Sequence, residues 1–292
     1  MNIALYGRTF TQHKANDVHA IFEVIAKFDA KCIIFEPYLK YLRKELKLKS
    51  DFETFNSRHD LKGNADFMLS IGGDGTLLDT VSLIHDSLIP VIGINIGRLG
   101  FLSSVFVEEL THTLDCLAKR HYVLDPRSLL RLETSNNLFG ENNIALNDLV
   151  IQNKQSSSMM TVDAYLNGEY LNSYWADGLI ISTPTGSTGY SLSCGGPIMM
   201  PQAESFILTP IAPHNLNVRP VIVSDKNVIS LEVKGRSESF LATLDSRSET
   251  FDETVQLAVK KEEFPLNLIR LSNENFLTTL RKKLNWGLDK RN

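Results

Sequence analysis

The five residues from Gly72 to Thr76 combine glycines with a carboxylate in a pattern that suits phosphate chemistry. They follow an apolar run, Phe67 to Ile71, and precede a helix-like stretch, Leu77 to Ile84. A strand, a glycine turn and a helix start in this order direct free backbone N–H groups and the positive end of a helix dipole toward one point, where a phosphate can bind. The predicted phosphate loop consists of Gly72, Gly73, Gly75 and Thr76.

An aspartate stands at the centre of this loop. Asp74 would repel a bound phosphate unless it coordinates Mg²⁺ or takes a proton from the group that receives a phosphoryl. The Walker A pattern is absent, and the segment from Gly72 to Thr80 contains no lysine, so backbone groups and a metal would hold the phosphates. The alternative is a structural Asp-Gly turn in which Asp74 or Thr76 caps the helix.

A second unusual segment, from Ala176 to Ser191, is rich in hydroxyl groups and glycine. Five Ser or Thr residues lie between Ser182 and Thr188, and an aromatic ring follows at Tyr190. Hydroxyls and backbone groups can bind the edges of a nucleobase or sugar, glycine permits close approach, and an aromatic face can stack. A loose Ser/Thr/Gly linker is the alternative, but the apolar run immediately before the segment argues against it.

Polar residues also interrupt an apolar run at Asn147 and Asp148. An amide that contacts a base edge, beside a carboxylate that accepts from two ribose hydroxyls, would satisfy both groups. A plain turn or bulge is the alternative. Asp177 allows the same two interpretations, with an Asp-Gly turn as the simpler one. For His214, beside Pro213, a structural role is favoured over a catalytic one.

The elements that must position these residues differ between the two halves of the chain. Up to about residue 125, strands and helices alternate, which predicts a parallel sheet covered by helices. The expected strands are Asn2–Tyr6, Lys31–Phe35, Phe67–Ile71 and Pro90–Ile94, and the expected helices are Ala15–Phe28, Leu39–Leu48 and Leu77–Ile84. Ligands bind beyond the carboxyl ends of such strands, so the loop at Gly72–Thr76 and the loop at Asn95–Phe101 are expected to share one edge.

After Pro126 the pattern changes to short β-like runs separated by turn formers, as in a β-rich domain. The expected strands are Leu129–Glu133, Ala145–Gln152, Met159–Leu166, Gly178–Ser182, Val218–Val223, Val228–Val233 and Leu241–Leu244. Phe276, Leu280 and Leu284 predict a final amphipathic helix. We therefore expect an α/β domain over residues 1–125, a β-rich domain over 126–264, and a C-terminal segment, 265–292, that returns to the first domain.

Composition narrows the functional class. The 292 residues carry a formal charge of −4, which gives no general attraction for nucleic acid or anionic membranes. In the stretch from Lys40 to Lys49, basic residues alternate with apolar ones, as expected for an amphipathic helix with a solvated face. The three cysteines are widely spaced and favour reduced thiols, and no stretch approaches the ~18 apolar residues of a membrane span. We expect a cytoplasmic protein with no membrane or nucleic-acid partner.

Motifs along nearly the whole chain closely resemble the NAD kinase family. In order, they are GGDGT at 72–76, GRLGFL at 97–102, Asn147-Asp148, DGLIISTPTGSTGYSLSCGGP at 177–197, and TPIAPH at 209–214 followed by Arg219-Pro220. GGDGT alone is shared with diacylglycerol kinases and 6-phosphofructokinases, whereas the long motif at 177–197 is specific to NAD kinases. The resemblance implies the two-domain fold of NAD kinases and diacylglycerol kinases.

The resemblance also implies an activity: transfer of the γ-phosphoryl group of ATP to the 2′-hydroxyl of the adenosine ribose of NAD, giving NADP. Mg²⁺ or another divalent metal would assist, its ligands being unknown, and the chain would form a homodimer or homotetramer. Asp74 would be the general base, Asn147 would bind the adenine side and Asp148 the ribose hydroxyls. The NAD-binding residues implied in this way are Asp74, Gly75, Asn147, Asp148, Trp175, Asp177, Thr185, Thr188, Gly189, Tyr190, Ser191, Leu192, Ser193, Ala212 and Arg247.

Several positions depart from the family pattern. Asp148 stands where Glu is usual, Gly189 where Ala is commoner, and Arg247 where Gln is expected. Trp175 stands where the residue type bears on the choice between NAD and NADH, so the acceptor stays open, as does the donor, ATP or polyphosphate. The alternatives are a lipid or sugar kinase of the same superfamily and a non-catalytic protein that binds NAD(H).

Overall fold

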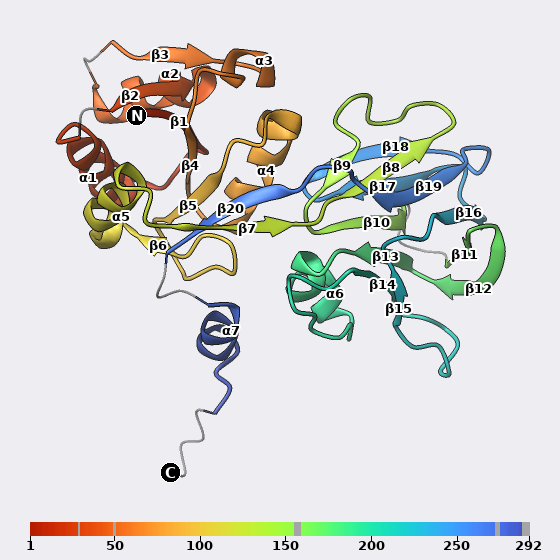
Figure 1. Cartoon of the computed structure of the whole chain (residues 1–292). Helices are drawn as coiled ribbons and strands as arrows, with labels where there is room; N and C mark the ends of the chain where they lie inside the picture. Colours follow the sequence, from red (N-terminus) through yellow and green to blue (C-terminus); the bar gives the residue numbers. More distant parts are fainter. Residues whose placement is uncertain (29, 49–50, 155–158, 272–274, 288–292) are drawn as a thin grey trace. The chain divides into compact units, whose positions relative to one another are not determined.

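The computed structural model describes residues 1–28, 30–48, 51–154, 159–271 and 275–287. The chain forms two compact units: Met1–Pro126 with Leu266–Asn292, and Arg127–Pro265 (Figure 1). Within the described ranges, none of the helices has the length and apolar character that a membrane span requires.

The first unit is built on an eight-stranded sheet whose strand order is β3-β2-β1-β4-β5-β20-β7, with β6 paired to β5. The strands are β1 Asn2–Gly7, β2 Lys31–Phe35, β3 Glu53–Phe55, β4 Phe67–Ile71, β5 Val91–Asn95, β6 Val105–Phe106, β7 Val123–Arg127 and β20 Leu266–Arg270. Every residue of β4 and β5 is buried, as expected for parallel strands covered on both faces. The predicted parallel sheet is confirmed.

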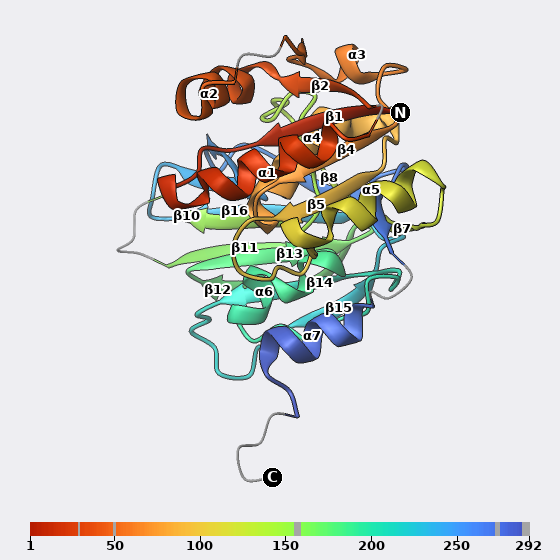
Figure 2. The same ribbon diagram turned by 90° about the vertical axis from the view of Figure 1, so that its left-hand side faces the viewer.

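Helices cover this sheet on both faces. They are α1 Ala15–Ile25, α2 Glu36–Leu46, α3 Arg58–Leu61, α4 Asp74–Ile84 and α5 Leu110–Ala118, and a further helix of the same unit, α7 Phe276–Leu284, follows β20. Apolar side chains of α1, α2 and α5 share one buried cluster with the strands. Figures 1 and 2 show α1 and α5 on the same side of the sheet and α4 on the other.

Two predicted helix starts were wrong in an informative way. The second helix begins at Glu36 and not at Leu39, because Pro37 is accommodated in the first turn, where its missing N–H has no intrahelical partner to lose. Helix α4 begins at Asp74 and not at Leu77, with Gly73 as its N-cap. Asp74 therefore belongs to the first turn of the helix, where the dipole favours a negative charge.

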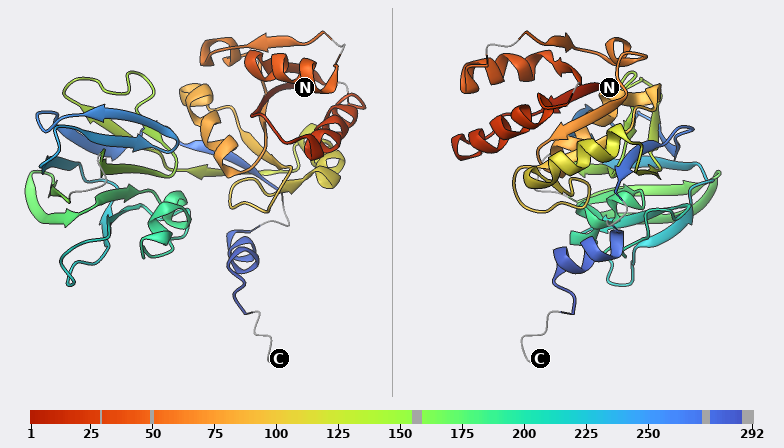
Figure 3. Two further views of the ribbon diagram at one scale, coloured as in Figure 1. Left: turned by 180° about the vertical axis from the view of Figure 1, so that it is seen from behind. Right: turned by 60° about the vertical axis from the view of Figure 1, so that its left-hand side comes forward.

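The second unit consists of two six-stranded antiparallel sheets, β15-β14-β13-β10-β17-β18 and β12-β11-β16-β19-β8-β9. The strands are β8 Leu130–Thr134, β9 Ile144–Ala145, β10 Asp148–Asn153, β11 Met160–Leu166, β12 Glu169–Ala176, β13 Gly178–Ser182, β14 Ser205–Ile211, β15 Val221–Ser224, β16 Ile229–Gly235, β17 Phe240–Leu244, β18 Arg247–Phe251 and β19 Leu257–Lys261. One apolar cluster contains residues of both sheets, so the sheets pack face to face. Figure 3 shows these strands from two further directions. The predicted β-rich texture is confirmed.

The run predicted as one strand from Ala145 to Gln152 is divided into β9 and β10. The chain bends at Leu146 and Asn147, whose N–H groups donate to the side chain of Asp245. The predicted strand Val218–Val223 begins only at Val221. Both differences concern loops that carry predicted site residues or lie next to them.

Candidate functional site

The phosphate loop lies between β4 and α4. Gly72 has φ +152°, and a Cβ added there would lie 2.3 Å from Oγ1 of Thr76, so only glycine fits. Gly73, the N-cap of α4, offers no side chain to the first N–H groups of the helix. The helix N-terminus is thus left with backbone donors and the positive end of its dipole, the arrangement that binds anions.

Asp74 ties this helix start to the loop after β5. Its Oδ2 accepts from the N–H of Phe101 at 2.8 Å, and its Oδ1 accepts from Leu102 at 3.0 Å and Ser103 at 2.9 Å. The predicted meeting of the two loops at one edge is therefore confirmed. An ionised carboxylate has about four acceptor sites. Asp74 keeps capacity for a further donor such as a substrate hydroxyl.

Asn95 gives the second loop its shape. The residue is buried, and its side-chain amide donates to the carbonyls of Arg98 at 2.7 Å and Ser103 at 3.1 Å. Its Oδ1 accepts from the N–H of Gly97 at 2.6 Å. The sequence placed Asn95 in this loop without assigning it a role; a buried amide at the end of an apolar strand was the available signal.

A charged group that the sequence analysis missed lies beside the phosphate loop. Arg8 follows β1, which pairs with β4 in a register that joins Gly7 to Ile71. Its Nε and Nη2 donate to the two carboxylate oxygens of Asp79 on α4, each at 2.5 Å. Tyr6 also donates to Asp79, and burial, reinforced by this carboxylate, raises the pKa of the Tyr6 hydroxyl. The signal in the sequence was the position of Arg8 immediately after β1, because β1 neighbours β4.

In the second unit, the bend at Asn147 carries the predicted amide and carboxylate. The carbonyl of Asn147 accepts from the N–H of Thr183 at 2.9 Å, and the Thr183 hydroxyl donates to the carbonyl of Leu146 at 2.5 Å. Oδ1 of Asn147 is buried and has no hydrogen-bond partner within the described ranges. A buried acceptor without a partner is costly, so this oxygen is suited to a ligand that brings a donor.

The hydroxyl-rich segment packs directly against this bend. It forms a 3₁₀ turn, Thr185–Thr188, followed by the short helix α6, Tyr190–Ser193. A Cβ at Gly186 would lie 2.1 Å from the carbonyl oxygen of Asn147, and a Cβ at Gly189 would lie 3.6 Å from its Nδ2 and 3.8 Å from Oδ2 of Asp148. The segment is structured and partly buried, so the linker interpretation was wrong.

Its other predicted members differ in exposure. Thr185 is buried and accepts from Nη1 of the buried Arg127 at 3.3 Å, whereas Ser191 is buried and hydrogen-bonded to Thr209 at 2.8 Å. Tyr190 is 41% exposed and is available to a ligand. Thr188 and Leu192 are partly exposed, and Ser193 is exposed.

Two carboxylates interact at the bend. Asp148 is only 6% exposed, and burial, followed by the negative charge of Asp245, raises its pKa to about 7. Burial raises the pKa of Asp245 to about 6, although three backbone N–H groups and the charge of Arg247 act in the opposite direction. Like charges in a poorly solvated place hinder each other's ionisation. Near neutral pH, protonated and ionised forms of these two carboxylates are therefore both populated.

The remaining predicted residues lie on β12, at the start of β13 and after β14. The ring centroid of Trp175 lies 4.1 Å from that of His214, and the His214 N–H donates to the Trp175 carbonyl at 2.9 Å. Asp177 donates its N–H to Ile211 at 3.0 Å, and Ala212 has φ +43°, an unusual conformation for a residue with a Cβ. Trp175 is 49% exposed, so an indole face is open to solvent beside these residues. The structural role expected for His214 stays a prediction.

Arg247 is placed differently from the other predicted NAD-binding residues. Its guanidinium donates to the backbone carbonyls of Asn142 and Ile144. The predicted site residues thus form two sets: Gly72–Thr76 in the first unit, and the bend, the 185–193 segment, Trp175, Asp177, Ala212 and Arg247 in the second.

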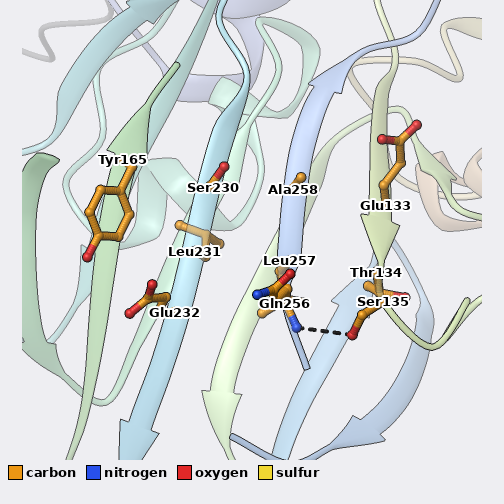
Figure 4. Close-up of a pocket in the computed structure, with 10 residues that line it drawn as sticks. All are labelled: Glu133, Thr134, Ser135, Tyr165, Ser230, Leu231, Glu232, Gln256, Leu257 and Ala258. Carbon is orange, nitrogen blue, oxygen red and sulfur yellow. Dashed lines mark hydrogen bonds between the residues drawn. The ribbon is translucent and has the colours of Figure 1, made fainter. Parts of the chain in front are cut away.

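Two cavities lie away from these residues. One, of about 410 Å³, is lined by Glu133, Tyr165, Glu232 and neighbours on one sheet of the second unit (Figure 4). The other, of about 420 Å³, is lined by Phe22, Cys32 and neighbours in the first unit. Neither is lined by a predicted site residue. In the ranges that the structure describes, no group of three or more His, Cys, Asp or Glu side chains is arranged to hold a metal ion.

Comparisons with known proteins agree with this arrangement. The ATP-NAD kinase N-terminal domain family matches residues 9–122, and the ATP-NAD kinase C-terminal domain family matches residues 146–271. An NAD kinase from Cytophaga hutchinsonii is 50% identical over 293 residues, covering 100% of both chains.

Two solved structures have the same fold. A crystal structure of an NAD kinase from Archaeoglobus fulgidus in complex with ATP has a TM-score of 0.72 and 28% identity, covering 98% of this chain and 99% of that one. A yeast NADH kinase complexed with NADH has a TM-score of 0.85 at 22% identity, covering 99% and 89%, a likeness that concerns the fold alone. With both domain families matched and half of its residues shared over the full length of a curated NAD kinase, the chain belongs to the ATP-NAD kinase family.

Proposed function

We propose that this chain transfers the γ-phosphoryl group of ATP to the 2′-hydroxyl of the adenosine ribose of NAD, giving NADP, with Mg²⁺ as the assisting metal. The observation that carries the proposal is the Asp74 carboxylate, fixed by three backbone N–H groups at the N-terminus of α4. A fixed carboxylate beside a phosphate-binding helix start suits an alcohol acceptor, which must lose a proton as it attacks. Family membership and the ATP complex of the Archaeoglobus relative support it.

The residues have separate tasks in this proposal. Backbone N–H groups of the phosphate loop bind the donor phosphates, and Asp74 accepts the proton of the 2′-hydroxyl. In the second unit, the unpartnered Oδ1 of Asn147 accepts from the adenine amino group, and Asp148 accepts from the ribose hydroxyls. Thr185, Thr188, Gly189 and the residues of α6 line the dinucleotide site, with Trp175, Asp177 and Ala212 toward the nicotinamide.

The donor set fits a metal that arrives with the phosphates. Mg²⁺ is commonly bound by one or two carboxylates together with substrate phosphates and water, so it needs no preformed protein cluster. Asp74 has one acceptor site left after its three backbone bonds, and this site is assigned to the 2′-hydroxyl, so the substrate phosphates and water would supply the metal ligands. The metal would neutralise charge on the donor phosphates. The homodimer or homotetramer and the cytoplasmic location stay predictions.

The test is NADP formation from NAD and ATP with Mg²⁺, compared with NADH as the acceptor and polyphosphate as the donor. Replacing Asp74 by Asn should lower kcat by about 10²–10⁴-fold, the range of general base catalysis. NAD binding by calorimetry should be retained. Asp86→Asn is the matched control, because Asp86 lies just after the same helix and is half exposed.

Near-normal turnover of Asp74→Asn would remove Asp74 from the role of base. No product with any donor, while NAD still binds, would favour a non-catalytic NAD-binding protein. A higher kcat/KM for NADH than for NAD would reassign the acceptor and leave the phosphoryl transfer in place.

A further inference from the structure

The turn between β17 and β18 consists of only two residues, Asp245 and Ser246. The strands are paired up to the turn, with Leu244 opposite Arg247. Asp245 has φ +54°, the left-handed conformation that two-residue hairpin turns require and that Gly or Asn adopts with less strain than most residues. Aspartate, like Asn, tolerates this conformation, and the contacts of its side chain show a further role.

The Asp245 carboxylate binds the backbone of the Asn147 bend. It accepts from the N–H groups of Leu146 at 2.8 Å and Asn147 at 2.7 Å, and more weakly from that of Asp148 at 3.4 Å. In return, the N–H of Asp245 donates to the carbonyl of Asp148 at 3.1 Å. Three successive residues of the bend are thus fixed by one side chain.

Arg247 binds the same segment through backbone carbonyls, whereas Asp245 binds it through backbone N–H groups. Its guanidinium donates to the carbonyls of Asn142 and Ile144, on the chain that leads into the bend. An anion on the N–H groups and a cation on the carbonyls can hold one stretch of backbone in a single conformation, because charge-assisted hydrogen bonds are roughly twice as strong as neutral ones.

We propose that Asp245 and Arg247 are positioning residues for the acceptor site: together they clamp the bend that presents Asn147 and Asp148 to NAD. The clamp also sets the charge around Asp148. The carboxylate of Asp245 faces it from the hairpin turn, with Arg247 beside Asp245, and the hydroxyl of Tyr190 and the thiol of Cys194 interact with it from α6 and the residue that follows. This inference rests on the proposed function.

The charges give the clamp a signature that a purely structural role lacks. Asp148 must be ionised to accept from the ribose hydroxyls, so NAD binding weakens as pH falls through its pKa. Asp245→Asn removes a neighbouring negative charge, which lets Asp148 ionise at lower pH. Arg247→Gln removes a positive charge that lowers the pKa of Asp245. The acid limb of kcat/KM for NAD should move to lower pH in Asp245→Asn.

The experiment measures KM for NAD, KM for ATP, kcat across pH, and NAD binding by calorimetry. Asp245→Asn should raise KM and Kd for NAD about tenfold, the equivalent of one hydrogen bond to a charged group, and leave KM for ATP within about twofold. Arg247→Gln should raise KM for NAD less. The control is Asp252→Asn, whose carboxylate binds Thr254 in the exposed turn after β18.

An unchanged KM for NAD in Asp245→Asn, or an acid limb that does not move to lower pH in this variant, would overturn the clamp. If Asp245→Asn does not fold, the KM for NAD of Arg247→Gln decides alone, and a value equal to that of the wild type would count against the clamp. If the wild-type chain forms no NADP, the proposed function fails, while NAD calorimetry across pH with the same variants still tests the clamp.

Discussion

Asp74 and Asp245 use the same device in different units of the molecule. Each carboxylate accepts from three successive backbone N–H groups of a segment that is distant in sequence. Asp74 lies at the start of a helix, whose dipole favours its charge. Asp245 lies in a hairpin turn and faces a second carboxylate, Asp148, which opposes its charge.

This difference separates two ways of building a site. In the first unit, one carboxylate both shapes the loop and is proposed to react, so structure and chemistry depend on the same group. In the second, Asp245 holds the backbone and Asp148 is left to face the acceptor. A substitution in the first unit should therefore affect turnover most, and one in the second should affect NAD binding.

The sharpest way to break the first device is Gly100→Ala. A Cβ at Gly100 would lie 2.0 Å from Oδ1 of Asp74, so the loop or the carboxylate must shift. A displacement of this size should lower kcat about 100-fold, with KM for NAD little changed. Gly97→Ala is the control in the same loop, since its Cβ would lie 3.8 Å from Asn95. Equal kcat values for the two variants would contradict the dependence of turnover on the position of Asp74.

The corresponding substitution at the bend of the second unit is Gly186→Ala. Its Cβ would lie 2.1 Å from the carbonyl oxygen of Asn147, which pushes the bend away from the 3₁₀ turn. Overpacking of this kind typically costs about 1–3 kcal/mol. KM for NAD should rise about tenfold or more, with a smaller change in KM for ATP. In Gly189→Ala the nearest atom is 3.2 Å away, so a milder rise is expected; a larger one would refute this geometry.

The pair at Asp148 and Asp245 predicts that NAD binding depends on pH. With the pKa of Asp148 near 7, the ionised form predominates at pH 8 and is the minor form at pH 6. Calorimetry in the absence of ATP should show that Kd for NAD increases roughly five- to tenfold when the pH is lowered from 8 to 6. Asp148→Asn should bind NAD weakly at both pH values. A pH-independent Kd in the wild-type chain would rule out titration of this carboxylate.

The ionised carboxylate of Asp148 should lower the free energy of unfolding. The pKa of Asp148 is higher in the folded state than the ordinary 3.8, so the folded state holds the extra proton between these values and stability falls as pH rises through this window. Asp148→Asn should therefore raise Tm by about 2–4 °C at pH 8, and by less at pH 5. A lower Tm at pH 8 would show that the ionised carboxylate is stabilised by contacts that outweigh its burial.

Much of the fold could be predicted because its central elements are locally distinct. The strands at Lys31–Phe35 and Phe67–Ile71 were predicted with the bounds they have, since both are short apolar runs between polar segments. β12 was missed because it is an edge strand whose apolar run is interrupted by Asn172 and Ser173, and β14 was missed because Pro210 lowers its strand character. β14 is nevertheless paired with β13 on one side and with β15 on the other.

The placement of several site residues could also be predicted. Asp74, Asn147 and Asp148 stand out because they are polar groups in apolar or glycine-rich surroundings. Asp245 and Arg8 could not be assigned their roles, because their partners lie about one hundred and about seventy residues away in the sequence. Such contacts depend on strand order and hairpin placement, which composition and spacing do not encode.

The position of β20 has a consequence for how the chain is made. Residues Leu266–Arg270 lie between β5 and β7 in the sheet of the first unit, although every residue of the second unit precedes them in the chain. During synthesis, which proceeds from the N-terminus, β5 and β7 leave the ribosome well before the strand that joins them. The second unit is complete in sequence earlier than the first, so a chain that has been synthesised only as far as Pro265 would hold every residue of the β-rich unit and a sheet with a missing strand.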